Sequence, residues 1–263
     1  MTDSTVWMAL FLSLFAGLST CIGGAVVFFS NLKNTRFLAL SMSFAAGVMI
    51  YVSFMEMLPE AQLVLADLYG NYSGVSIMVG LFFLGMLLVF CIEKLFPSLS
   101  EIKDTETEKL PNKSRLYRTG ILVAIALAIH NFPEGIATFI GGVNDLSVGL
   151  MIAFAIALHN IPEGIAVAAP IYYSTGNKWK AFRYSLYSGI AEPIGAFVAF
   201  LVLGDLMTEQ IFSFTLAIIA GIMVYISFDY LLPGSWKYGN KKDTINGTIV
   251  GMAVMAISLL LFD

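Results

Sequence analysis

Two near-identical hexapeptides hold the residues of this chain that are best suited to bind a metal ion. Both read His-Asn-x-Pro-Glu-Gly, at residues 130–135 and 159–164, and they contain the only two histidines in the sequence. Side chains four positions apart lie on one face of a helix, so each histidine shares a face with the glutamate of its own hexapeptide. Imidazole and carboxylate together form a ligand set for first-row divalent cations. We therefore predict a metal site that is built from His130, Glu134, His159 and Glu163.

Further polar residues lie at a similar depth in the apolar segments. Glu192 is central in the segment 181–203. Asn131 and Asn160 lie about 100° around the helix from their histidines, where they either bind metal through oxygen or orient other ligands. Two histidines and three glutamates exceed the needs of one four-coordinate ion, so we predict a second, bridged metal at the same depth.

Three more polar residues lie nearer the ends of apolar segments. Ser53 and Glu56 share a helical face that could line a pathway, and Asp229 lies near the opposite side of the membrane. We predict that Glu56 is a ligand at the entrance of this pathway, with Ser53 beside it, and that Asp229 is a ligand at the exit. Glu60, just beyond Glu56, is interpreted as an ordinary carboxylate in interfacial water.

The composition indicates that the solvent of this chain is a membrane. The sequence is 58% hydrophobic and 12% charged, whereas soluble domains carry about 25% charged residues. We predict an all-α polytopic membrane protein with one domain, residues 1–263, and one long connection, at about 96–117. That connection contains no His or Cys and is assigned no metal role. Eight segments approach or exceed the roughly 20 residues that a spanning helix needs, at about 6–29, 37–58, 74–95, 118–140, 147–170, 181–203, 211–232 and 245–262.

The distribution of positive charge predicts the orientation in the membrane. All 14 Lys and Arg residues fall in or beside alternate connections of the eight-span arrangement, and the remaining connections and both termini carry acidic residues. Because basic loops stay in the cytoplasm, we predict a multi-pass protein of the cell (inner) membrane with both termini outside.

Internal similarity predicts an inverted repeat. Residues 46–59 match residues 220–233 at eight of 14 positions, in spans that cross the membrane in opposite directions. Together with the duplicated hexapeptide, this match predicts a 3+2+3 arrangement in which the first three and last three spans are related by a two-fold axis in the membrane plane. Such repeats are typical of transporters whose sites lie near the midplane. Weaker matches pair residues 22–23 with 194–195 and residues 79–80 with 250–251.

The hexapeptides, Glu192 and the repeat resemble the ZIP (Zrt/Irt-like) family of metal transporters, most closely its bacterial ZupT-type members. This resemblance implies uptake of Zn²⁺, and also of Fe²⁺, Mn²⁺, Co²⁺ or Cd²⁺, into the cytoplasm. It further implies a two-metal site between the spans at 118–140, 147–170 and 181–203, an elevator-like alternating-access motion, and the homodimer that is common among relatives. The metal ions are transported substrates, so no cofactor and no nucleic-acid partner is expected.

Two alternatives use the same residues. A metal-selective channel could be built on this fold, and an intramembrane metal-dependent hydrolase could use the ligands to activate water. The His-Glu-x-x-His pattern of metalloproteases is absent from the sequence, and an enzyme does not explain an inverted repeat. We therefore expect a transporter rather than an enzyme.

Overall fold

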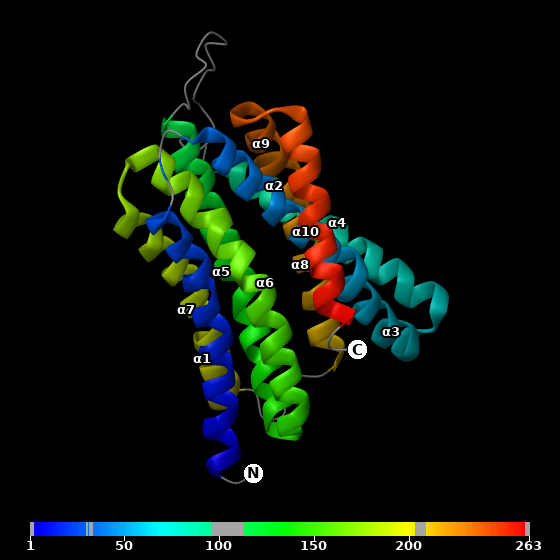
Figure 1. Ribbon diagram of the computed structural model, residues 1–263. Helices are drawn as coiled ribbons and strands as arrows, with labels where there is room; N and C mark the ends of the chain where they lie inside the picture. Colours follow the sequence, from blue (N-terminus) through cyan, green and yellow to red (C-terminus); the bar gives the residue numbers. More distant parts are fainter. Residues whose placement is uncertain (1–2, 30, 32–33, 96–112, 203–208, 261–263) are drawn as a thin grey trace.

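The computed structural model describes residues 3–29, 31, 34–95, 113–202 and 209–260, and these residues form helices and no strand (Figure 1). Eight helical segments within them are long and apolar enough to cross a membrane. The predicted all-α architecture with eight spans is therefore confirmed. Six of the spans are built mainly from a single α-helix, and the first five of these are α1 (Asp3–Ala25), α4 (Asn71–Leu95), α5 (Lys113–Asn144), α6 (Leu146–Thr175) and α7 (Lys178–Val202).

The second and seventh spans are each interrupted by a π-helical turn. The second consists of α2 (Thr35–Val52), η2 (Ser53–Met57) and α3 (Leu58–Tyr69). The seventh consists of α8 (Glu209–Ile226), η4 (Ser227–Leu231) and α9 (Leu232–Tyr238). The eighth span is the single helix α10 (Lys241–Leu260).

Several predicted boundaries were wrong at helix ends. The second and seventh spans continue past 58 and 232, because Pro59 and Pro233 occupy first-turn positions, where a proline starts a helix well. Helix α5 begins at Lys113, so the last part of the predicted connection 96–117 is helical. The remainder of that connection, 96–112, lies outside the described residues. Hydropathy detects the apolar part of a helix and misses its polar ends.

The two π-helical turns support the inverted repeat residue by residue. They occupy equivalent positions of the matched segments 46–59 and 220–233. The Ser53 carbonyl accepts a hydrogen bond from the Leu58 backbone N–H, and the Ser227 carbonyl accepts one from the Leu232 backbone N–H. The two serine hydroxyls also behave alike, since each donates to the carbonyl four residues earlier in its own helix.

Two bundles make up the molecule. Helices α1, α5, α6 and α7 pack on one another and form the first bundle (Figure 1). Helices α2, α3, α4, α8, α9 and α10 form the second. The bundles meet where α6 contacts α2 and α10, and where α5 contacts α8.

Close helix approaches in the first bundle explain the glycine of each hexapeptide. A Cβ atom on Gly135 would lie 1.8 Å from the Glu192 carbonyl oxygen of α7, and one on Gly164 would lie 1.9 Å from the Thr20 carbonyl oxygen of α1. Neither position can hold a side chain without separating the helices. The two contacts are equivalent, because residue 20 corresponds to residue 192 when residues 22–23 are aligned with 194–195. The predicted match of those two dipeptides is therefore confirmed.

The weaker match of residues 79–80 with 250–251 was wrong in register. Gly251 lies against the carbonyl of Phe44, and Gly85 lies against the carbonyl of Ile218, which is the repeat counterpart of Phe44. Nothing lies within 4 Å of a Cβ placed on Gly80. Gly85 is therefore the structural counterpart of Gly251, five positions from the predicted one.

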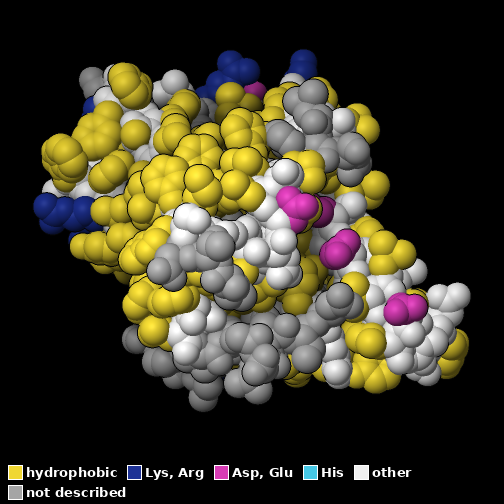
Figure 2. Space-filling model, turned by 90° about the horizontal axis from the view of Figure 1, so that it is seen from below, with side chains coloured by type: hydrophobic (Ala, Val, Ile, Leu, Met, Phe, Trp, Pro, Cys, Tyr) yellow, Lys and Arg dark blue, Asp and Glu magenta, His cyan; other side chains and the backbone are white. Residues whose placement is uncertain are grey.

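Charge divides the two ends of the molecule. The described Lys and Arg side chains lie at the helix ends that point up in Figure 1, such as Lys94 near the end of α4 and Lys178 at the start of α7. We call this the basic end. At the opposite, acidic end, Asp145 caps the start of α6. Figure 2 shows the acidic end from below, with Asp and Glu side chains near the middle of the face and Lys and Arg toward its edges.

Candidate metal centre

Helices α5 and α6 bring the two hexapeptides together in the interior of the protein. Both helices continue through the proline of their hexapeptide. Glu134 Oε1 lies 2.8 Å from His159 Nε2 and 3.1 Å from His130 Nε2, so one carboxylate oxygen joins both imidazoles. His130 Nε2 also lies 3.3 Å from Glu163 Oε1. The predicted group of two histidines and two glutamates is thus joined by a chain of contacts that runs His159–Glu134–His130–Glu163.

These distances suit a metal ion as well as hydrogen bonds. Ligand atoms of His130, Glu134 and His159 all lie within 4.8 Å of one another, and all three residues are buried. At bond lengths near 2.0–2.2 Å, two ligands of a tetrahedral zinc are separated by roughly 3.4 Å. The two printed separations from Glu134 Oε1, 2.8 and 3.1 Å, are close to that value, so these ligand atoms lie near enough to enclose an ion together.

Several buried oxygens near this cluster have no hydrogen-bond partner. They include Glu134 Oε2, Glu163 Oε2 and Glu192 Oε1, on side chains that are almost or entirely inaccessible to solvent. An unpaired buried carboxylate oxygen is costly, and such a group in a native structure calls for an ion or a proton. The arrangement is therefore one that a cation would stabilise.

Asn160 and Asn131 use their amide nitrogens and leave their oxygens available. Asn160 Nδ2 donates to Glu192 Oε2 at 2.8 Å and to the Ala16 carbonyl at 3.1 Å. Asn131 Nδ2 donates to the Ser188 carbonyl at 3.3 Å. The Oδ1 atoms of both side chains are buried without a partner. Both asparagines thus have an oxygen that can bind a cation, and Asn160 also orients Glu192. Ala16 and Ser188 hold the two asparagine side chains through their backbone carbonyls, and a sequence motif does not reveal such backbone partners.

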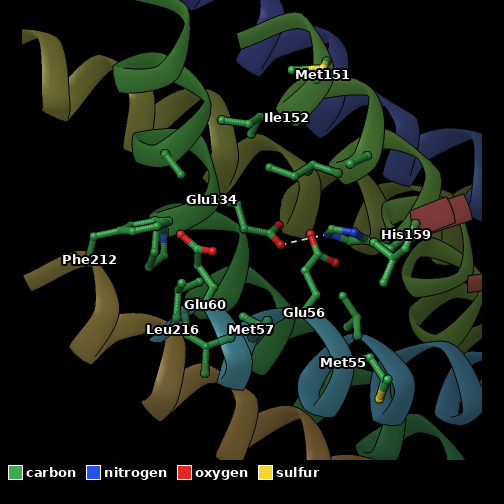
Figure 3. Close-up of a pocket in the computed structure, with 17 residues that line it drawn as sticks. Met55, Glu56, Met57, Glu60, Glu134, Met151, Ile152, His159, Phe212 and Leu216 are labelled. Carbon is green, nitrogen blue, oxygen red and sulfur yellow. Dashed lines mark hydrogen bonds and ion pairs between the residues drawn. The ribbon is translucent and has the colours of Figure 1, made fainter. Parts of the chain in front are cut away.

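A cavity of about 430 Å³ leads to one side of this cluster. Its inner wall includes Glu134 and His159. Its outer wall is formed by residues close to helix ends at the acidic end, such as Met151 of α6, Phe212 of α8 and Leu259 of α10. The cavity therefore runs between the two bundles from the acidic end to Glu134 and His159 (Figure 3).

The opposite side of the cluster is closed by apolar packing. His130 is 1% exposed and Glu163 is 0% exposed, and neither lines the cavity. Further toward the basic end, fully buried side chains of both bundles belong to one apolar core, for example Leu127 of α5, Val167 of α6 and Met223 of α8. The cluster thus has one open side and one sealed side.

The predicted pathway residues have different environments. Glu56 lines the cavity. Ser53 is fully buried outside the cavity lining, and its hydroxyl donates to the Met49 carbonyl at 2.7 Å. Asp229 is exposed in η4 and is also outside that lining. The ligand roles of Ser53 and Asp229 stay predictions.

Glu60 was interpreted from the sequence as an interfacial carboxylate without a role, yet it lines the same cavity as Glu134 and His159. Its position one helical turn after Glu56 is the signal that could have identified it.

Comparison with known proteins identifies the family. The profile of the family described as ZIP Zinc transporter matches residues 97–259. Three relatives named Zinc transporter ZupT align over almost their whole lengths. The protein from Lysinibacillus sphaericus is 49% identical, over 98% of this chain and 99% of the relative. The proteins from Streptococcus mutans and Campylobacter jejuni are 48% and 47% identical, each over 98% of this chain and over 98% and 97% of their own lengths.

This similarity extends over essentially the entire chain. It bears out the resemblance that the motifs predicted, makes the chain a transporter rather than an enzyme, and makes metal ions its substrates rather than its cofactors. The chain is a member of the ZIP zinc transporter family, of the bacterial ZupT type.

Proposed function

We propose that this protein carries zinc into the cytoplasm through the cluster of His130, Glu134, His159 and Glu163. The observation that supports the proposal is the one-sided access to this cluster. A cavity from the acidic end reaches Glu134 and His159, whereas His130 and Glu163 are sealed. A site that opens to one side at a time is the requirement for alternating access.

The inverted repeat suggests how the site opens to the other side. Glu134 and His159 exchange places with Glu163 and His130 under the pseudo-two-fold relation. A second state in which the first bundle shifts against the second would then expose His130 and Glu163 to the basic end. Glu134 Oε1 contacts both imidazoles, so an ion bound to it needs little movement within the site during this exchange.

The direction of transport follows from charge. The positive-inside rule places the basic end in the cytoplasm and both termini outside, so the cavity opens outward. A divalent ion that moves into a negative interior gains roughly 4.6 kcal/mol per 100 mV. No further energy source is required for uptake in this proposal.

The ligand types suggest a broader range of substrates. Imidazole and carboxylate without thiolate accept Fe²⁺, Mn²⁺, Co²⁺ and Cd²⁺ as well as Zn²⁺. The unpartnered oxygens of Asn131, Asn160, Glu163 and Glu192 provide hard ligands for a second ion beside the first. We include a two-metal site and transport of these other ions in the proposal, and a homodimer stays a prediction.

Zinc-65 uptake into proteoliposomes with an inside-negative potential tests this function. We expect saturable uptake by the wild type and a loss of at least 100-fold in Glu134→Ala and His159→Ala. Asp67→Asn is the matched control, because Asp67 is an exposed acidic residue at the same end that does not line the cavity. Equal uptake by His159→Ala and wild type would contradict the proposal. Ohmic single-channel currents would show that the protein is a channel, the alternative to a carrier.

A further inference from the structure

Two carboxylates lie along the cavity between its opening and the His/Glu cluster. Glu56 belongs to the π-helical turn η2 and Glu60 to the first turn of α3, and both line the cavity. They are four residues apart, so their side chains lie on the same side of the chain. Glu56 is partly exposed and Glu60 is exposed. The two residues, which we call the mouth pair, therefore meet an ion before the histidines do.

A buried carboxylate faces the mouth pair from the first bundle. Figure 3 shows Glu134 directed into the space between Glu56 and Glu60. Glu134 is only 7% exposed, and its Oε2 has no hydrogen-bond partner. Its other oxygen is already in contact with His159. Glu134 thus offers one oxygen to the histidines and one to the cavity.

Electrostatics also connect the mouth pair to the cluster. Glu56 and His159 line the same cavity, and a Glu56 carboxylate attracts a divalent cation that is bound beside His159. A cation at the mouth pair would therefore move inward along a continuous row of carboxylates, from Glu60 and Glu56 to Glu134.

The inverted repeat shows that the mouth pair is not a by-product of symmetry. When residues 46–59 are aligned with 220–233, Glu56 corresponds to Tyr230 and Glu60 to Gly234. The backbone is duplicated, including the π-helical turn, but the acidic pair is present in only one copy. The two carboxylates thus belong specifically to the side on which the cavity opens.

We propose that Glu56 and Glu60 form a second, separate cation site that captures a divalent ion at the mouth of the cavity and delivers it to Glu134. This proposal rests on the proposed transport function. Oxygen-only sites hold hard divalent cations with little discrimination, whereas imidazole favours zinc and its neighbours. The mouth site therefore raises the local ion concentration, and the His/Glu cluster selects among the captured ions.

The first test is the concentration dependence of zinc-65 uptake in proteoliposomes. Removing one charge about 4–6 Å from a divalent ion weakens its binding by roughly ten- to thirtyfold in water-like surroundings. We expect Glu60→Gln to raise the half-saturating zinc concentration by that factor, with the maximal rate within about twofold of wild type. Asp67→Asn, which removes a charge from the same helix away from the cavity, leaves both values unchanged. A Glu60→Gln variant with an unchanged half-saturating concentration overturns the proposal.

The second test does not depend on transport. Mn²⁺ is a hard ion that carboxylates hold well, and its binding to the full-length protein in nanodiscs can be counted by electron paramagnetic resonance. We expect the double variant Glu56→Gln/Glu60→Gln to bind one Mn²⁺ fewer than wild type. His159→Ala retains that ion, because the mouth pair is intact in this variant. Equal elution of all variants in size-exclusion chromatography checks that they are folded.

The two tests separate failure of the mouth site from failure of the transport function. If the wild type shows no saturable uptake but the double variant loses one Mn²⁺, the transport function is wrong and the mouth site stands. If uptake is saturable and the double variant binds as many Mn²⁺ ions as wild type, the mouth site is wrong and the transport function stands.

Discussion

The two hexapeptides are almost the same in sequence but lie in different environments. His159 and its partner Glu134 border a cavity that reaches the acidic end, whereas His130 and Glu163 lie against packed apolar side chains. The backbone contacts of the two hexapeptides are nevertheless equivalent, since Gly135 and Gly164 each lie against a carbonyl of a neighbouring helix. Identical motifs thus provide the ligands, and the packing around them determines which ligands an ion can reach.

The largest expected effect tests what the two hexapeptides share. In Gly135→Leu and Gly164→Leu the new Cβ would lie within 2 Å of a carbonyl oxygen, so the helices must separate. We expect both variants to lose most of the folded protein, to a similar extent, as measured by thermal unfolding in detergent. Gly80→Leu is the control, because nothing lies within 4 Å of a Cβ at that position. A stable Gly164→Leu variant would contradict the proposed equivalence.

The next effect tests what differs between the hexapeptides. In a background of Cys21→Ser and Cys91→Ser, which removes both cysteines, we expect His159→Cys to react with a membrane-impermeant thiol reagent. The reagent is added from the acidic end to metal-free protein. Position 159 lines the cavity, whereas position 130 is sealed, so labelling of His130→Cys should be at least tenfold slower. Equal labelling of the two positions would show that the cavity does not define access.

A smaller effect concerns the seal at the basic end. Leu127 is fully buried in the apolar core that both bundles share. Leu→Ala in a packed core costs about 2–5 kcal/mol, part of which weakens the sealed arrangement. We expect Leu127→Ala to increase labelling of His130→Cys from the basic end about three- to tenfold.

The control for this prediction is Leu12→Ala, which removes a similar side chain from a core within the first bundle. It should reduce thermal stability without increasing labelling at position 130. If both substitutions increased labelling equally, general loosening of the protein would explain the result, and the seal would not be located at Leu127.

Much of the fold was predictable because it depends on local features. Apolar length predicted the eight spans, and alternating charge predicted the distinct basic and acidic ends. The boundaries near Pro59 and Lys113 were wrong, since polar helix ends lack a hydropathy signal. The match that was assigned to Gly80 was wrong for a different reason. Single glycines in apolar helices are common, and only the contact with a neighbouring carbonyl identifies Gly85 as the equivalent of Gly251.

For the candidate site, the sequence by itself determined which side chains are available and at what depth. The spacing of His130 and Glu134 within one helix, repeated in α6, is a local property that requires no knowledge of packing. The tertiary structure decided that Glu134 contacts both histidines, that Glu60 lines the cavity, and that Leu127 is buried in the apolar core that both bundles share. These features arise where the two bundles meet. The contacts there join helices far apart in the chain, and no local pattern records which of their faces pack together.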